Sequence, residues 1–360
     1  MTEEAPILVS HTRLREFIGR VLGALGMPPH IVDSTARLMV GTDLRGVDSH
    51  GIGMLPRYVE WTRGGFIDLA AEPKTVRDDL ATALLDGQKG LGHYPSTLGM
   101  EMAIAKARTY GVGIVAVRNS NHYGAAANYS MMALAHDMIG LTTTNSPYIA
   151  MVPTFGRTRM LSTNPISLAA PAGSEPPFVL DMATTTVAVG KLVIASRWGK
   201  PIPEGWAMDP TGKLTTDPKV ALAHRLLSPL GGSRELGGHK GYGLGVMVDI
   251  LSGVLSGAVY GDLFWRSDMQ KDKLHNVGHC FAAIDPARFR PIEEFKADMD
   301  DMLRALKNSP KAAGEERIYT AGEPEAECER RRLVEGIPLA PALVQQVNEI
   351  AQSLGLAPLA

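Results

Sequence analysis

An imidazole stands next to a hydroxyl at a glycine-containing turn in residues 48–54, whose sequence is Asp-Ser-His-Gly-Ile-Gly-Met. Imidazole gains and loses a proton near neutral pH, so His50 is suited to general acid or base chemistry in a cleft. The free backbone of Gly51 lets the turn aim that ring, while Ser49 can hydrogen-bond within the turn. A simpler interpretation is also open, in which Asp48 and Ser49 only cap the helix that follows.

A second histidine, His122, lies in a polar segment between a predicted strand and a predicted helix. The segment, residues 119–124, reads Asn-Ser-Asn-His-Tyr-Gly and is followed by alanines. Loops of this kind present free backbone N–H groups and the positive end of a helix dipole, where α/β proteins bind phosphates. The segment lacks the G-x-G-x-x-G pattern of dinucleotide-binding loops, so a plain polar loop fits these residues equally well.

Two further segments carry side chains that suit cofactor binding. Asp181 ends a short apolar run, where its carboxylate can accept from ribose hydroxyls or orient a histidine, with helix capping as the simpler alternative. His239 and Lys240 stand on glycine-rich backbone at a helix start and suit contact with a pyrophosphate or a nicotinamide amide. An ordinary glycine-rich loop also explains them. The glycines at 241, 243 and 245 lie inside an apolar helix, so they indicate close packing rather than a Rossmann turn.

No metal site is predicted. Residue types that bind zinc are present, but none of four candidates stands in the H-x-x-x-H or H-E-x-x-H spacing that places two ligands on one helix face. These candidates are His50, His122, His239 and Asp181. His275 and His279 are separated by one helical turn in sequence, yet no acid lies between them, and we expect a partly exposed structural pair.

Composition points to a small-molecule partner. The 360 residues include 36 Lys and Arg against 38 Asp and Glu, a balance that gives nucleic acid or an anionic membrane no strong general attraction. The two cysteines, Cys280 and Cys328, indicate neither a disulfide framework nor a thiolate zinc site, and we expect a cytoplasmic location without an export signal. The longest apolar stretch, residues 241–260, contains Asp249 and several glycines, which favours a buried helix over a membrane span.

Hydrophobic periodicity predicts the elements that position these groups. The chain begins with helices, continues with a hairpin after residue 74 and then becomes α/β, and it ends with helices. Predicted helices cover residues 14–22, 31–42, 55–63, 95–110, 125–136, a glycine-rich run from 239, 291–306 and 341–354. Predicted strands cover residues 75–77, 83–85, 112–117, 139–144, 166–170, 178–180 and 281–284. The charged segment 325–335 is predicted to wrap the surface.

In this order, the motifs resemble the type-2 malate/L-lactate dehydrogenase family, which is unrelated to the Rossmann enzymes, and they are most similar to its hydroxycarboxylate dehydrogenase branch. The resemblance implies a non-Rossmann α/β fold. Residues 1–74 and 285–360 would form a helical domain, and residues 75–284 would form a mixed-sheet NAD(P)-binding domain. It also implies a homodimer whose sites lie between domains. The motifs that carry it are residues 48–54, 119–124, 163–165, 180–184 with 190–191, 239–242, 322–323, 330–331 and 336–338.

The resemblance also implies residue roles. His50 would exchange the hydroxyl proton with help from Ser49, and His122 is the second candidate for that role. The cofactor is NAD or NADP. Residues matching the family's cofactor contacts are His50, Gly124, Ala125, Ala126, Val179, Leu180, Asp181, Met182, Ala183, His239, Asn276, Gly322, Glu323, Pro324 and Glu325.

One departure from the family bears on the substrate. Many members have an arginine three residues after the glycine of Ser-His-Gly, where a guanidinium can bind the substrate carboxylate, whereas this chain has Met54. Arg57 or Arg45 would then take over, and a methionine-lined pocket would admit bulkier 2-oxo or 2-hydroxy acids than malate or lactate. Three alternatives stay open: a cyclic imino acid reductase on the same fold, a metal-dependent hydrolase, and a dimeric binding protein.

Overall fold

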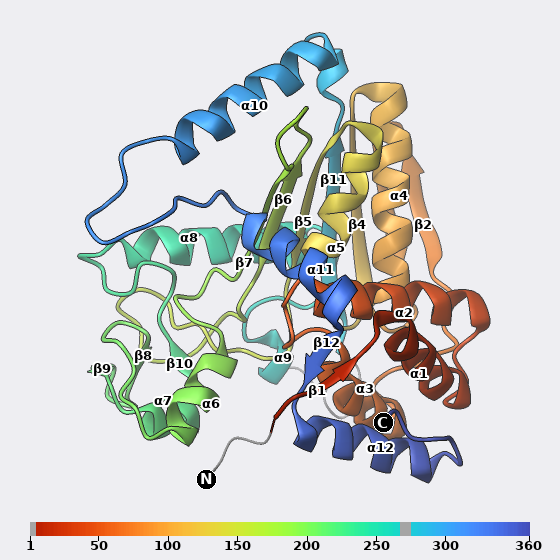
Figure 1. Cartoon of the computed structure of the whole chain (residues 1–360), viewed down its shortest axis with the longest axis vertical. Helices are drawn as coiled ribbons and strands as arrows, with labels where there is room; N and C mark the ends of the chain where they lie inside the picture. The colour runs from red at the N-terminus through yellow and green to blue at the C-terminus, as the bar shows by residue number, and fades with distance from the viewer. Residues whose placement is uncertain (1–4, 267–274) are drawn as a thin grey trace.

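The computed structural model describes residues 5–266 and 275–360, and its centre is a seven-stranded mixed sheet (Figure 1). The strands lie in the order β2-β3-β4-β11-β5-β6-β7. Their bounds are β2 Lys74–Asp79, β3 Thr82–Asp86, β4 Val112–Ser120, β11 Val277–Ile284, β5 Ile139–Thr144, β6 Ile166–Ala170 and β7 Phe178–Met182. Strands β3 and β4 pair in parallel, and the other neighbours pair antiparallel. The predicted α/β class with a mixed sheet is confirmed.

Helices cover the sheet and also form a group of their own. Their bounds are α1 His11–Ala24, α2 Pro29–Leu44, α3 Leu55–Arg63, α4 His93–Tyr110, α5 Ala127–Ser130, α6 Val189–Arg197, α7 Pro218–His224, α8 Gly238–Asp249, α9 Leu263–Arg266, α10 Ile292–Lys307, α11 Glu323–Glu335 and α12 Pro341–Ser353. Tighter or wider turns form the 3₁₀ helices η1 Ile52–Met54, η2 Met131–His136 and η5 Pro286–Arg288, and the π-helix η3 Ile250–Val254. No helix in the described ranges combines the length and apolar character that crossing a membrane requires.

Alternate residues of β11 show which helix covers each face of the sheet. An added Cβ at Gly99 of α4 would lie 2.7 Å from the ring of Phe281. On the other face, an added Cβ at Gly278 would lie 1.9 Å from the carbonyl oxygen of Ser252 in η3. Because α4 and η3 cover opposite faces, β11 is buried along most of its length. Strand β11 lies between β4 and β5. The two strands of the predicted strand-helix-strand unit, residues 112–144, are therefore not neighbours in the sheet.

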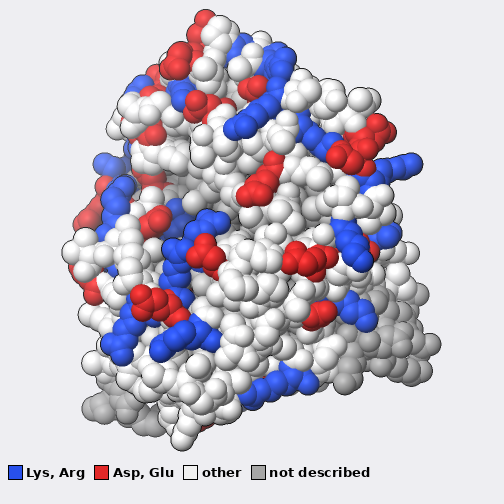
Figure 2. Space-filling model, turned by 90° about the vertical axis from the view of Figure 1, so that its right-hand side faces the viewer, with Lys and Arg blue, Asp and Glu red and all other residues white. Residues whose placement is uncertain are grey.

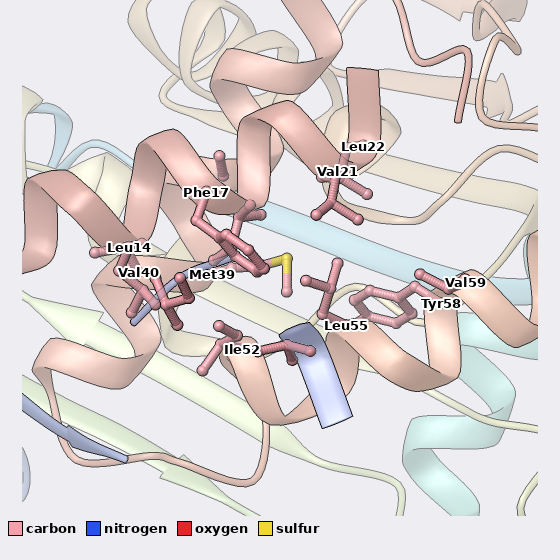
Figure 3. Close-up of a cluster of buried hydrophobic side chains, with 14 of the residues drawn as sticks. Leu14, Phe17, Val21, Leu22, Met39, Val40, Ile52, Leu55, Tyr58 and Val59 are labelled. Atoms are coloured by element: carbon pink, nitrogen blue, oxygen red, sulfur yellow. The ribbon is translucent and has the colours of Figure 1, made fainter. Parts of the chain in front are cut away.

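The helices at the two ends of the chain share one hydrophobic core. Figure 3 shows side chains of α1, α2, η1 and α3 converging in it, among them Phe17, Met39 and Leu55. Val347 of α12 belongs to the same core, and β1 (Ile7–Val9) pairs with β12 (Ile337–Leu339) beside it. The apolar positions of α1 recur at three- and four-residue steps, which is why its buried face was predictable. The domain boundaries at residues 74 and 285 stay a prediction.

A smaller lobe is built by α6, α7 and a three-stranded sheet in the order β10-β8-β9. Its strands are β8 Ala207–Met208, β9 Leu214–Thr215 and β10 Leu226–Leu227. Helix α8 packs beside this lobe. An added Cβ at Gly241 would lie 2.2 Å from the carbonyl oxygen of Leu230, and one at Gly245 would lie 2.8 Å from Cε of Met151. These two glycines are packing points, as predicted, whereas Gly243 faces open space.

Three sequence predictions differ from the structure. Residues 125–136 contain the short helix α5 followed by the 3₁₀ helix η2, and at the junction the Ser130 carbonyl oxygen would lie 2.1 Å from an added Cβ at Gly140. The hairpin turn lies at Leu80, which has φ 39°, rather than at the preceding aspartates. Residues 325–335 belong to helix α11. The many charged residues of this segment gave no apolar pattern, although one face of the helix buries Arg332.

Figure 2 shows one face of the molecule, turned from the view of Figure 1, on which blue and red side chains are interspersed. The near-balance of 36 basic and 38 acidic residues is therefore visible on this face as a mixture, without a large patch of one sign.

Candidate functional site

Two histidines and a tyrosine meet where the turn after α2 contacts the loop after β4. The rings of His50 and His122 stack, with centroids 5.4 Å apart and planes inclined by 26°. The Nδ1 atom of His50 lies 2.8 Å from the hydroxyl of Ser49, and that of His122 lies 2.7 Å from the hydroxyl of Tyr58. The hydroxyls of Ser49 and Tyr58 thus occupy the Nδ1 atoms of the two rings, and the Nε2 atoms remain for a ligand.

The capping interpretation of the turn does not describe its hydrogen bonds. Ser49 bonds His50, and Asp48 pairs with Arg332 of α11. The backbone N–H of Ile52, at the start of η1, donates instead to the carboxyl of Asp43, at 2.7 Å. The side chains flanking His50 therefore hold the turn itself.

Burial keeps both imidazoles uncharged in the free protein. It lowers the pKa of His50 below the usual 6.5, and it lowers the pKa of His122 further, with added repulsion from His50, His93 and His279. The N–H of Gly124 lies 3.3 Å from Nδ1 of His122 and can only donate. The Nδ1 atom is therefore an acceptor, and the ring proton resides on Nε2.

Tyr58 is the site residue that sequence reasoning missed. It lies in α3, inside the predicted helix of residues 55–63, and packs fully buried in the core. Burial raises the pKa of its hydroxyl, so the group stays protonated and donates to His122. Its hydroxyl could have indicated a role in the site, because a buried tyrosine hydroxyl usually has a hydrogen-bond partner.

The loop carrying His122 fits directly against the His50 turn. Gly124 has φ 78°, a conformation that favours glycine, and an added Cβ would lie 3.0 Å from Nε2 of His93 and 3.6 Å from the carbonyl oxygen of His50. Ala125 and Ala126 follow and are buried at the start of α5. The close approach leaves this backbone free of side chains on the side facing His50.

Asp181 binds the same segment from β7. Its carboxylate accepts the N–H of Ala127 at 2.7 Å, so it caps α5 rather than the helix that follows it in sequence. Asp181 is exposed to solvent, yet desolvation by the surrounding protein raises its pKa to about 6. The charge of Glu325 adds to this rise, and the N–H of Ala127 and the charge of Arg45 oppose it. Asp181 is therefore a carboxylate at neutral pH.

The start of α11 packs against β7. The N–H of Val179 donates to the carbonyl of Ala321 at 3.0 Å, and an added Cβ at Gly322 would lie 2.8 Å from Cβ of Val179. Glu323 is buried and accepts the N–H of Thr320 at 2.9 Å, so its side chain is occupied within the protein. Most of the predicted cofactor residues thus form one continuous region: Gly124, Ala125, Ala126, Val179, Leu180, Asp181, Met182, Ala183, Gly322, Glu323, Pro324 and Glu325.

Two predicted cofactor residues, His239 and Asn276, make no hydrogen bond to this region within residues 5–266 and 275–360. His239 lies in the first turn of α8, and its buried Nδ1 atom has no partner among the described residues. Asn276 accepts the N–H of Asn119 at 2.7 Å, a bond that closes the end of β4.

The three candidate substrate residues, Met54, Arg45 and Arg57, have different surroundings. Met54 packs partly buried against the helical core, and its role in a substrate pocket stays a prediction. Arg45 pairs with Glu329 of α11 at 3.3 Å. Arg57 lies on α3 next to Tyr58, with its guanidinium over the ring of Tyr148 at 5.9 Å and its side chain half exposed. Of the two arginines, Arg57 has the guanidinium that is more open to a ligand.

His275 and His279 do not form a pair. His279 is fully buried between the hydroxyls of Thr144 and Ser120, at 2.7 Å and 2.8 Å, which differs from the predicted partial exposure. His275 bonds Asn121 at 2.7 Å. The residues described, 5–266 and 275–360, contain no group of three side chains arranged to hold a metal ion.

Comparison with known proteins identifies the family of this chain. Residues 9–348 match the model of the malate/L-lactate dehydrogenase family. Malate dehydrogenase of Pyrococcus abyssi is 44% identical over 356 residues, covering 98% of this chain and 97% of that protein. L-sulfolactate dehydrogenase of Methanocaldococcus jannaschii is 40% identical over 342 residues, covering 95% and 96%. The crystal structure of malate dehydrogenase from Entamoeba histolytica has a TM-score of 0.93 and 35% identity, covering 98% and 99%. The chain therefore belongs to the malate/L-lactate dehydrogenase family and is an NAD(P)-dependent hydroxy acid dehydrogenase.

Proposed function

We propose that the protein interconverts 2-hydroxy and 2-oxo carboxylic acids, with His50 exchanging the hydroxyl proton. The observation that carries this proposal is the stacked His50–His122 pair, whose Nδ1 atoms are both occupied. Ser49 is exposed and connects His50 to solvent, whereas the hydroxyl bonded to His122 belongs to the buried Tyr58. A group that changes its proton in every turnover needs the solvent connection. His122 then donates its Nε2 hydrogen to the substrate oxygen and fixes its position.

Bound NAD or NADP supplies or accepts the hydride. The residues present fit a dinucleotide: Gly124 brings backbone close to His50 at a place that a Cβ would fill, and the Asp181 carboxylate keeps one oxygen for ribose hydroxyls after accepting from Ala127. The start of α11 encloses the region from the side of β7. Binding measurements with both dinucleotides test which of them the protein uses.

Arg57 is the proposed partner of the substrate carboxylate. A guanidinium can bind a carboxylate through two parallel hydrogen bonds, and this one, carried by helix α3 like Tyr58, lies over the ring of Tyr148. Relatives include enzymes named for malate and for sulfolactate, which both carry a second anionic group. We expect acids with such a group to be reduced better than pyruvate, and Arg57→Lys to raise KM for the acid more than it lowers kcat.

The decisive test is a spectrophotometric panel with reduced NAD and NADP. It includes oxaloacetate, sulfopyruvate, pyruvate, phenylpyruvate and piperideine-2-carboxylate, the last because delta1-piperideine-2-carboxylate reductase of Pseudomonas syringae has a TM-score of 0.83 to this chain at 26% identity, covering 96% of this chain and 100% of that one. Turnover of oxo acids supports the proposal. Turnover of the imine alone would assign the protein to imine reduction.

His50→Ala and His122→Ala separate the two imidazoles. Loss of a positioned acid or base costs about 10² to 10⁴ in rate, so we expect His50→Ala to lower kcat at least about 10²-fold with little change in cofactor affinity. Unchanged turnover in His50→Ala, with a large loss in His122→Ala, would transfer the proton role to His122.

We also propose a homodimer in the cytoplasm, where the free cysteines Cys280 and Cys328 would stay reduced. An exposed apolar stripe follows one side of α8 and η3, formed by Met247, Ile250, Val254 and Leu255, which are 39% to 57% exposed. A second copy of the chain would cover it. Val254→Glu should produce a monomer in light scattering, while Phe155→Glu, at a residue 86% exposed elsewhere, should not.

A further inference from the structure

A buried carboxyl lies directly beneath the turn that carries His50. Asp43, in the last turn of α2, is 1% exposed, and its Oδ2 atom accepts the N–H of Ile52 at 2.7 Å. An added Cβ at Gly51 would lie 2.0 Å from its Oδ1 atom. The turn therefore rests on this carboxyl, and its glycine allows the approach.

An arginine from the far end of the chain holds the other side of the turn. Arg332 of α11 donates to the backbone oxygen of Asp43 at 2.5 Å. Its guanidinium also binds both carboxylate oxygens of Asp48, one of them at 3.2 Å. His50 is thus flanked by two fixed points, Asp48 two residues before it and Ile52 two residues after it.

The two carboxyl groups carry different charges. Burial, then the charge of Asp48, raises the pKa of Asp43 to about 8, against the lowering effect of the Ile52 N–H and of Arg332. Asp43 is therefore mainly uncharged at neutral pH, and Asp48 is the anion that pairs with Arg332. Two further ionisable features lie near the turn: Cys328, whose Sγ packs on Gly46, and the Arg45–Glu329 pair.

We propose that Asp43 is a positioning residue, which together with Arg332 and Asp48 fixes the turn so that His50 meets the substrate oxygen. This inference rests on the proposed role of His50. Displacing a reacting group by about 1 Å costs about 10²-fold in rate, so the contacts on either side of His50 control kcat. Deprotonation of Asp43 places a buried anion near the exposed carboxylate of Asp48, and the repulsion between the two charges acts against the contacts that hold the turn. Oxidation of the hydroxy acid, which needs His50 as a base, then declines at alkaline pH.

Four variants test the inference: Asp43→Ala, Asp43→Asn, His50→Ala and the double variant Asp43→Ala/His50→Ala. A matched control is Asp300→Ala, because Asp300 is also a buried aspartate, 7% exposed, and accepts backbone N–H groups of Gly173 and Ser174 in the β6–β7 turn. Each protein is measured for kcat and KM in both directions across pH, for cofactor affinity and for thermal unfolding.

We expect Asp43→Ala to lower kcat about 10- to 100-fold with cofactor affinity nearly unchanged, and to have no further effect when His50 is already alanine. Asparagine is uncharged and can accept the same N–H, so Asp43→Asn should keep kcat within about threefold and lose the alkaline decline of the oxidation rate. Asp300→Ala should lose stability and keep kcat. If Asp43→Ala does not fold, the alkaline decline in Asp43→Asn decides the question.

The inference fails if folded Asp43→Ala has wild-type kcat while His50→Ala is inactive, if its loss is additive with that of His50→Ala, or if Asp43→Asn keeps the alkaline decline. Wild-type kcat in His50→Ala would instead remove the proposed function of His50, and the positioning role with it.

Discussion

Replacing Tyr58 with phenylalanine removes one hydrogen bond from the histidine pair and little else. The ring of Tyr58 packs against Trp61 and His93, with centroids 5.9 Å and 5.6 Å away, and phenylalanine keeps those contacts. The hydroxyl alone reaches Nδ1 of His122, at 2.7 Å. In the variant, Nδ1 retains only the N–H of Gly124, at 3.3 Å.

The size of the effect follows from this loss. Leaving a buried acceptor poorly satisfied costs about 1 to 3 kcal/mol, and the remaining Gly124 N–H places this case toward the lower end. A loss of about 1 to 2 kcal/mol in the transition state lowers kcat about 5- to 30-fold. The proton distribution of the ring also changes, because Nδ1 is then less strongly held as an acceptor.

The assay compares Tyr58→Phe with Tyr123→Phe at saturating cofactor and oxo acid. Tyr123 is equally buried, but its hydroxyl has no hydrogen-bond partner among the described residues, so its removal should leave kcat and stability nearly unchanged. Nitrogen chemical shifts of His122 should report the Nε2-protonated form in wild type and a mixture in Tyr58→Phe. Equal kcat in the two variants would refute the reasoning about His122.

Three further predictions concern pH and backbone. Because the pKa of Asp43 is raised to about 8, the folded state holds a proton that the unfolded state releases, so the free energy of unfolding should fall as pH rises toward 8, by up to about 1.4 kcal/mol per unit. Asp43→Asn should flatten this slope in chemical denaturation, and an unchanged slope would contradict the assignment. Burial lowers the pKa values of His50 and His122, so the acidic limb of kcat/KM for hydroxy acid oxidation should lie below pH 6.5, and a limb above that value would contradict the neutral pair. Gly124→Ala, at φ 78°, should cost about 1 to 2 kcal/mol of stability and weaken cofactor binding in titrations, whereas unaltered binding would separate this loop from the cofactor.

Local pattern was enough to predict helices α1, α2, α3, α10 and α12 and the core strands, but not α11. The apolar spacing of Leu14, Phe17 and Val21 needs only one buried face, and the structure buries all three. The position of β11 was not predictable in the same way, because its partners β4 and β5 precede it by more than a hundred residues and pairing depends on the whole sheet. The alternation of apolar residues predicts that a strand forms, but it does not predict which strands pair with it.

The contacts that hold the candidate site show the same limit. The motif around His50 identified a proton-carrying group, but Arg332 and Asp48 are 284 residues apart, and the charged run containing Arg332 suggested a solvated surface. Asp43 directly follows the predicted helix of residues 31–42, and the local pattern gives it no role. Only the packed structure reveals that Ile52 donates to it and that Gly51 lies on it.

Deuterium transfer from reduced nicotinamide carrying deuterium at both C4 positions tests the central claim most directly. The protein is incubated with the labelled cofactor and the 2-oxo acid that the panel identifies, in ordinary water, and the product is analysed by nuclear magnetic resonance. The account predicts a 2-hydroxy acid with deuterium bound to C2 and a hydroxyl proton taken from solvent. A product without deuterium at C2 would contradict it.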